Sequence, residues 1–471
     1  MNITRSSFKV FGANSLGAIL GFVGITFFAR QLTPYQLGAF FIFQSLFGLL
    51  SIPSDFGIDG AVNKRISEGK PSGAIFSTAL AMKFLPLLLI TILILLFKNV
   101  VNSYIGKELS LFLVGALVLQ ASGGLVLQTL KGELRVGETA LPKLFQKIIY
   151  VCLGAVLIIY GFGVFGLVYS FIAGLIVMIL WASYRSSIRL RKPSIAQARS
   201  LTNYSKYAVL FAVKGHFYSW VDVAVISLFL TQSHVSEYEL AWRITIIVIL
   251  LSRAVGQSIF PQISQWHAEG KKEQIEELIS RGTAMSLFLV IPAFFGSLVL
   301  STEILGVIFG EEYATAGIVL IILMGEKLFQ GAHVILGRSL QAIDQPKLAA
   351  KATVIALVLN VLLNLVLIWK YGIIGAAVAT TISFSMNTII HAKYLSNFVS
   401  IRIPYNQIGG MVAASSGMLM CVLVMKMIIS ADSILSLTAT IIIGTLIYIL
   451  LTLAFPSLRE LMTDTAQQLF R

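Results

Sequence analysis

Stretches of about 20 apolar residues recur along this chain from one end to the other. Each is long enough to cross a hydrocarbon core of roughly 30 Å. Of the 471 residues, 57% are hydrophobic and only 12% are charged, whereas soluble domains carry about 25% charged residues. The pattern therefore predicts an all-α membrane protein that crosses the bilayer many times.

We predict about 14 transmembrane helices from the apolar stretches. The predicted spans cover residues 10–30, 37–58, 73–97, 109–130, 144–161, 163–184, 204–230, 239–261, 283–309, 316–341, 349–370, 373–397, 408–430 and 437–456. The first lacks a small-residue cleavage site, so we interpret it as a retained helix and not a signal peptide. All loops between the spans are short, and none has room for a catalytic domain.

The basic residues predict the orientation of the spans. Most of the 35 Lys and Arg residues fall in or beside loops on the side that holds both termini. The segments on the opposite side contain only four basic residues, which are Arg30, Lys98, Lys107 and Lys370. Because basic residues accumulate in cytoplasmic loops, both termini are predicted to be cytoplasmic. The net charge of +14 is then a consequence of topology, and nucleic acid is not expected as a partner.

The two halves of the chain resemble each other. Three short motifs return in the same order and at equivalent loops. These pairs are Tyr35-Gln36-Leu37 with Tyr238-Glu239-Leu240, Glu68-Gly69-Lys70 with Glu269-Gly270-Lys271, and Gly163-Val164-Phe165-Gly166 with Gly372-Ile373-Ile374-Gly375. Each repeat holds six spans, an even number, so both halves enter the membrane in the same direction.

Such a parallel repeat predicts two six-helix lobes around a central cavity, with two extra C-terminal helices outside the repeat. We expect an N-terminal lobe at 1–190, a basic cytoplasmic linker at 191–203, a C-terminal lobe at 204–400, and the last two helices with a cytoplasmic tail at 401–471.

Several motifs, in order, carry a family resemblance. They are Ala29-Arg30-Gln31-Leu32-Thr33-Pro34 before Leu37-Gly38-Ala39-Phe40, Asp55-Phe56-Gly57 before Glu68-Gly69, Phe260-Pro261 before Glu269-Gly270, and Leu336-Gly337-Arg338 with Leu340-Gln341-Ala342 before Tyr371-Gly372-Ile373-Ile374-Gly375-Ala376-Ala377. The chain resembles the Wzx-type O-antigen and polysaccharide flippases of the multidrug/oligosaccharidyl-lipid/polysaccharide exporter superfamily. It departs from the repeat at Leu240-Ala241, where the glycine of Leu37-Gly38 is missing.

The resemblance implies a two-lobed transporter with a central, often cationic cavity that works by alternating access. It implies a glycan carried on undecaprenyl or another polyprenyl pyrophosphate as cargo, and the bacterial inner membrane as location. Membrane lipids and other polysaccharide-assembly proteins are the expected partners.

Charged residues inside spans are costly and usually face the protein interior or a water-filled cavity. Basic residues outnumber acidic ones there, which suits a pyrophosphate. Lys214, Tyr218 and Asp222 share one helical face. The residues expected to contact cargo are Lys214, Arg253, Arg243, Lys83, Arg30, Asp222 and Tyr218. The alternatives are a structural Lys214–Asp222 pair and interface anchoring by Arg243 and Arg30.

Two polar stripes are candidates for coupling to H+ or Na+. Glu326, Gln330 and His333 lie at i, i+4 and i+7. Asp55 ends a second stripe that begins with Gln44, Gly48 and Ser51, beside Pro53. The alternative is that neighbouring helices satisfy these stripes. For Gln120, Gly124 and Gln128, and for Asn360 and Asn364, we expect interhelical contacts and not ligand binding.

The leading hypothesis is therefore a flippase for a lipid-linked oligosaccharide, without cofactor, metal or catalytic residues. The chain lacks a Walker A motif, an HExxH motif and paired Cys–His spacing. A multidrug/cation antiporter of the same superfamily is the first alternative, and it predicts an acidic cavity. A membrane-embedded polysaccharide polymerase or ligase is the second, and such an enzyme would need a large outer loop.

Overall fold

The computed structural model describes residues 3–186, 188–428 and 431–469, and it describes their side chains except at 3–8, 207–219, 462 and 464–469. Within this part of the chain every regular element is a helix. The all-α prediction is confirmed. The chain divides into two compact units, unit 1 (Met1–Ser236) and unit 2 (Glu237–Arg471). The predicted domain limits at 190, 204 and 400 stay a prediction.

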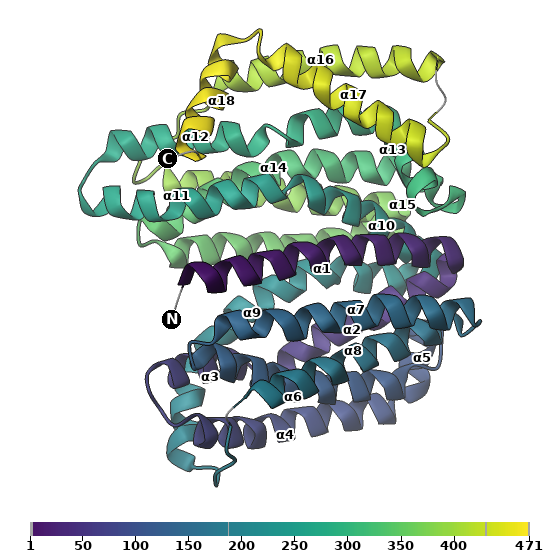
Figure 1. Ribbon diagram of the computed structural model, residues 1–471, viewed down its shortest axis with the longest axis vertical. Coiled ribbons are helices and arrows are strands. Elements are labelled where there is room, and N and C mark those ends of the chain that lie inside the picture. The colour runs from purple at the N-terminus through teal and green to yellow at the C-terminus, as the bar shows by residue number, and fades with distance from the viewer. Residues whose placement is uncertain (1–2, 187, 429–430, 470–471) are drawn as a thin grey trace. The chain divides into compact units, whose positions relative to one another are not determined.

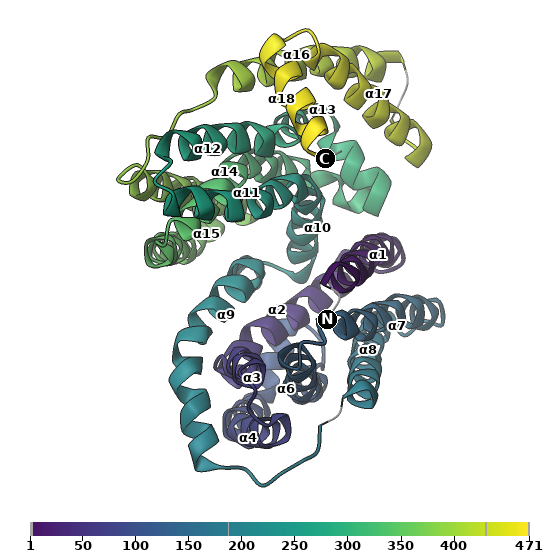
Figure 2. The same cartoon turned by 60° about the vertical axis from the view of Figure 1, so that its left-hand side comes forward.

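Unit 1 consists of helices that are drawn from purple to teal in Figure 1. They are α1 (Ile3–Gln31), α2 (Pro34–Asp55), α3 (Ile58–Ser67), α4 (Ser72–Leu96), α5 (Lys98–Ile105), α6 (Ser110–Gly132), the 3₁₀ turn η1 (Val136–Thr139), α7 (Ala140–Ile159), α8 (Gly163–Arg185) and α9 (Ile195–Phe229). α7 packs against α8 and α1, α3 packs against α6, and α9 runs along α2 and α3. Figure 2 shows α9 on the side of unit 1 where α2 and α3 lie.

Unit 2 contains the remaining helices, and α10 (Gln232–Val248) crosses the boundary between the units. The others are α11 (Leu250–Ala268), α12 (Lys272–Leu287), α13 (Val290–Phe309), the 3₁₀ turn η2 (Glu311–Ala316), α14 (Gly317–Ala342), α15 (Pro346–Leu395), α16 (Tyr405–Ile428), α17 (Ile434–Thr452) and α18 (Pro456–Leu469). α14 packs against α15, α11 and α13, and α16 packs against α13 and α17.

In the described part of the chain, 11 helices are long and apolar enough to cross a membrane, or up to 12 if the bent pair α10 and α11 is one span. The predicted number of about 14 is not confirmed. Part of the difference lies in α15, a 50-residue helix in which Gly372 has non-helical dihedral angles (φ 61°, ψ −143°). This break separates two of the predicted spans, 349–370 and 373–397.

The internal repeat appears in the backbone. Gly69 and Gly270, at equivalent positions, have φ values of 83° and 73°. Gly163 and Gly372, the next equivalent pair, have φ values of 55° and 61°. Side chains other than glycine rarely adopt these angles. These four glycines of the repeated motifs therefore lie where each half turns with a positive φ.

Candidate functional site

The candidate site is a pocket inside unit 1 where α2 ends. Thr33 and Gln36 form a capping box that begins α2, and Pro34 occupies the first turn. The helix ends at Asp55 because Phe56 and Gly57 turn the chain through left-handed conformations (φ 48° and 76°) before α3. This break exposes the first turn of α3, which needs acceptors for its N–H groups.

Asp55 supplies those acceptors. Its Oδ2 accepts from the Gly57 backbone N–H at 3.1 Å, and its Oδ1 accepts from the Asp59 backbone N–H at 3.1 Å. The predicted polar stripe thus ends on a carboxylate that holds the α2–α3 break in place. The same carboxylate remains about one-fifth exposed and reaches the pocket.

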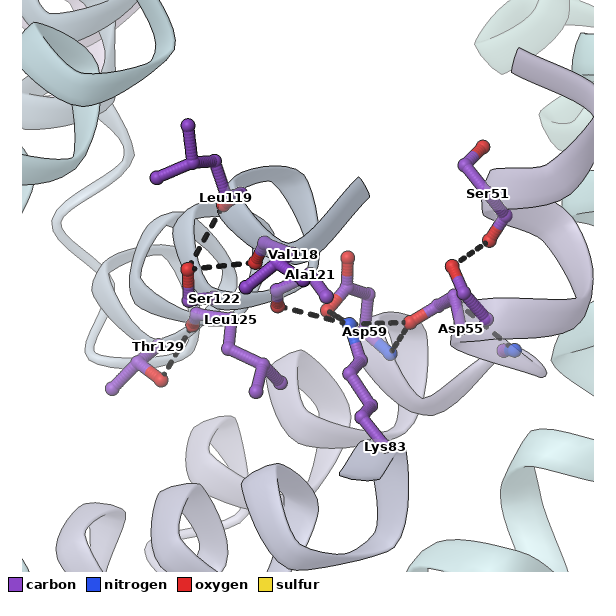
Figure 3. Close-up of polar contacts among 12 residues, drawn as sticks. Ser51, Asp55, Asp59, Lys83, Val118, Leu119, Ala121, Ser122, Leu125 and Thr129 are labelled. Atoms are coloured by element: carbon purple, nitrogen blue, oxygen red, sulfur yellow. Dashed lines mark hydrogen bonds and ion pairs between the residues drawn. The ribbon is translucent and has the colours of Figure 1, made fainter. Parts of the chain in front are cut away.

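Lys83 enters the site from α4. Its Nζ lies 2.7 Å from Asp55 Oδ1 and 2.7 Å from Asp59 Oδ1, and it also donates to the Ala121 carbonyl of α6 at 3.4 Å. Figure 3 shows this arrangement, with the ammonium between the two carboxylates. The Lys83 side chain is only 3% exposed. The lysine, a candidate for cargo contact, is therefore compensated by two acids within its own unit.

The pocket has a volume of about 280 Å³. Its wall combines charged, amide, hydroxyl and aromatic groups with small residues. The lining residues are Gln44, Phe47, Gly48, Ser51, Ile52, Ser54, Asp55, Asp59, Lys83, Gln120, Ala121, Phe171 and Trp220. Among these lining residues, two carboxylates face one ammonium, so the site carries one net negative charge when both acids are ionised.

Asp59 lies in α3, outside the helices that are long enough to span a membrane. Burial raises the pKa of Asp59 to about 6, against the opposing effect of the Lys83 ammonium and with a further rise from Asp55.

Two glycines make room for the polar groups. A Cβ at Gly124 on α6 would lie 2.7 Å from Asp59 Oδ2, and a Cβ at Gly48 on α2 would lie 2.6 Å from Trp220 Cδ1. Gly48 belongs to the polar stripe with Gln44, Ser51 and Asp55, and all four line the pocket. Sequence spacing identified this stripe but gave no sign of Trp220, which comes from α9.

The other candidates in unit 1 lie in different surroundings. Arg30 is exposed at the end of α1, and Asp222 is buried in α9. The side chains of Lys214 and Tyr218 lie outside the described residues. Gln120, for which we expected helix–helix contact, lines the pocket. The structure thus brings Lys83 and Asp55 together and adds Asp59, Gln120 and Trp220.

In unit 2 the predicted cargo residues are arginines. Arg243 forms an i,i+4 pair with Glu239 at 2.9 Å within α10. Arg253 is exposed on α11. Asn360 donates to Thr380 across the break in α15 at 3.3 Å, and Asn364 donates to Asn360 at 3.1 Å. Asn360 thus joins the two halves of α15, as expected of an interhelical contact, whereas the bond from Asn364 to Asn360 lies within the first half.

In the predicted coupling stripe of unit 2, Glu326 and Gln330 are buried and His333 is half-buried. Glu326 is 0% exposed and lies 2.5 Å from the Nζ of its neighbour Lys327. That ammonium stands 4.3 Å from the centre of the Trp242 ring. About two helical turns further along α14, His333 meets His391 edge to face, with ring centres 4.4 Å apart. Glu326 is thus part of an internal ion pair.

Comparisons with known proteins agree with this architecture. A family model described as polysaccharide biosynthesis protein matches residues 27–317. The chain is 49% identical over 98% of both sequences to a probable low-salt glycan biosynthesis flippase of Haloferax volcanii. It is 29% identical to a probable flippase of the same organism, over 88% of each chain.

A solved structure shares the fold. A lipid II flippase in an inward closed conformation matches with a TM-score of 0.82 at 20% identity, over 96% of this chain and 98% of that chain. At this identity the match shows the fold alone. Together with the apolar helices, it establishes a multi-pass helical membrane protein.

Proposed function

This chain belongs to the family of polysaccharide biosynthesis proteins, and we propose that it is a flippase that moves a lipid-linked oligosaccharide from the cytoplasmic to the outer leaflet. The observation that carries the proposal is the 49% identity, over 98% of both chains, with a relative named a glycan biosynthesis flippase. The two relatives from Haloferax volcanii both carry the name flippase, which describes a transporter and not an enzyme.

The geometry of unit 1 supports transport of a polar head group. Its helices present apolar side chains outward, such as Leu85, Leu89 and Leu93 of α4, whereas Lys83 on the same helix points into a polar pocket. Polar groups at membrane depth are tolerated where they are buried in protein or line a water-filled space. We propose that alternating access moves the head group past such surfaces while the polyprenyl tail stays in lipid.

We propose a polyprenyl pyrophosphate as the carrier, with arginines as its contacts. A pyrophosphate needs cations, and arginine can donate two parallel hydrogen bonds to it. Arg253 and Arg30 are exposed side chains, whereas Lys83 is enclosed by two carboxylates. We therefore propose pyrophosphate contacts at Arg253 and Arg30 in preference to Lys83. Arg243 and Lys214 stay candidates from the sequence alone.

Orientation and location belong to the same proposal. The excess of Lys and Arg in alternate loops supports cytoplasmic termini in the plasma membrane. The expectation of a bacterial inner membrane stays a prediction. The two relatives from Haloferax volcanii are named a probable low-salt glycan biosynthesis flippase and a probable flippase, and O-antigen as the cargo likewise stays a prediction. Coupling to H+ or Na+ is also a proposal, with Asp55, Glu326 and His333 as its candidate groups.

The function is tested in a deletion strain of the source organism. Lipid-linked glycan should accumulate with its sugars accessible only from the cytoplasm, and expression of the intact chain should restore surface glycan. Purified protein in vesicles should make a labelled lipid-linked glycan accessible to an added glycosidase. Normal surface glycan in the deletion strain, with no accumulation of precursor, would exclude the proposal.

The net negative pocket of unit 1 also favours the rival function, a multidrug/cation antiporter, because an acidic site attracts organic cations. Efflux of a lipophilic cation such as tetraphenylphosphonium distinguishes the two functions. A flippase should leave the cellular level of this cation unchanged when the chain is overexpressed. An antiporter should lower it while glycan export stays normal in the deletion strain.

A further inference from the structure

The pocket of unit 1 has the wrong charge for the phosphate end of a lipid-linked glycan. Lys83 is its only cation among the described lining residues, and both acids lie 2.7 Å from the Lys83 ammonium. The third contact of the ammonium is the Ala121 carbonyl. An incoming phosphate would therefore meet a lysine whose donors are already used and two carboxylates that repel it.

The hydrogen-bonding groups of the pocket are mostly acceptors. Gln44 Oε1 is buried and has no hydrogen-bond partner. The hydroxyls of Ser51 and Ser54 donate to the backbone carbonyls of Gly48 and Ser51, which leaves their lone pairs as acceptors. A buried acceptor without a donor is costly, so Gln44 Oε1 is available to accept from an O–H or N–H group that enters the pocket.

The remaining wall is aromatic. Phe47 and Phe171 meet edge to face with ring centres 5.2 Å apart, and Trp220 stands against Gly48. All three line the same pocket as the carboxylates and amides. Aromatic rings offer a large, rigid, apolar surface, and the few polar groups beside them determine orientation. The C–H face of a sugar ring is apolar, and its edge carries hydroxyl donors.

From these three observations we propose that this pocket is a saccharide subsite: it binds an uncharged sugar ring of the cargo, whose hydroxyls donate to Asp59, Asp55 and Gln44 while one face of the ring stacks on Trp220 or Phe171. The inference rests on the proposed flippase function and adds that the sugar and the pyrophosphate of the cargo bind at separate sites. The sugar is recognised in unit 1 at an acidic pocket, and the pyrophosphate is recognised by cations elsewhere.

The test compares two lipids on the intact protein in nanodiscs. One is the lipid-linked oligosaccharide extracted from cells that lack this chain, and the other is the sugar-free polyprenyl pyrophosphate. The dissociation constant of each is measured for the wild type and for Gly124→Ala, which places a methyl group against Asp59 Oδ2. The control is Gly115→Ala on the same helix, where a Cβ would meet nothing within 4 Å.

We expect Gly124→Ala to weaken binding of the glycan-bearing lipid about tenfold, since hydrogen bonds to a charged acceptor are lost. Binding of the sugar-free lipid should not change, and Gly115→Ala should match the wild type for both lipids. Gln44→Met, which removes the acceptor at nearly constant volume, should reproduce the loss. If Gly124→Ala gives poorly folded protein, the Gln44→Met variant tests the same prediction.

Three results would overturn the subsite. Equal weakening for both lipids would place the phosphate in the pocket, and no change for either lipid would show that cargo does not enter it. Binding of tetraphenylphosphonium is measured on the same variants, and if Gly124→Ala weakens only that binding, the pocket is a cation site. A wild type that binds neither lipid would instead refute the flippase proposal, and the saccharide subsite with it.

Discussion

The ammonium of Lys83 lies 2.7 Å from Asp59 Oδ1 and joins the middle of α4 to the first turn of α3. Asp55, at the end of α2, lies equally close to the same nitrogen. One lysine therefore ties three helices together within unit 1. The contact also makes the pocket acidic, although Lys83 by itself would make it basic.

Removal of this lysine should destabilise the protein. Lys83→Met would leave two half-buried carboxylates without their cation, at a cost of about 3 kcal/mol. Loss of thermal stability in detergent measures the effect. The triple variant Lys83→Met, Asp55→Asn, Asp59→Asn should recover part of that stability because no uncompensated charge remains. If Lys83→Met melts like the wild type, the lysine is not bound as described.

Substitution of Gly38 on α2 should be among the most damaging conservative changes. A Cβ there would lie 1.7 Å from the Gln232 carbonyl oxygen, which belongs to backbone and cannot rotate away. Gly38→Ala should cost about 3 kcal/mol. Gly17→Ala on α1, where the space is open, should be within about 0.5 kcal/mol of the wild type. The melting temperatures of both variants check this difference.

Substitutions of Glu326 and Lys327 can distinguish a structural role of this ion pair from a role of Glu326 in ion coupling. Glu326→Gln leaves the buried Lys327 ammonium uncompensated and should lower stability by about 3 kcal/mol. The double variant Glu326→Leu, Lys327→Met should be nearly as stable as the wild type. If the folded double variant still exports glycan at the wild-type rate, Glu326 does not couple transport to an ion.

Arg253 should matter for cargo and not for folding. Its side chain is exposed on α11, so Arg253→Ala should change stability by at most about 0.5 kcal/mol. Export of lipid-linked glycan should fall about tenfold through the loss of a charged hydrogen bond to the pyrophosphate. Arg281→Ala, an exposed arginine that pairs with Glu277 on α12, is the control. Equal export by both variants would remove Arg253 from the cargo site.

Much of the architecture followed from the order of residues. Apolar length and low charge predicted a helical membrane protein. The paired motifs predicted equivalent turns in the two halves, and Gly163 and Gly372 indeed adopt matching φ values of 55° and 61°. These properties are local or periodic, so they can be recognised without knowing which helices touch. The spacing of Gln44, Gly48, Ser51 and Asp55 likewise identified the one face of α2 that lines the pocket.

Sequence patterns could not predict which charged side chains inside the protein pair with one another. Summing the charges inside the spans indicated a positive interior, but the electrostatics of a pocket depend on neighbours within a few ångströms. Packing of α2, α3, α4 and α6 brings Asp55, Asp59 and Lys83 together across 28 residues of sequence and adds Gln120 from α6 and Trp220 from α9. Only the folded unit therefore made the pocket acidic, because the sign of its charge is set by contacts between helices that no periodicity records.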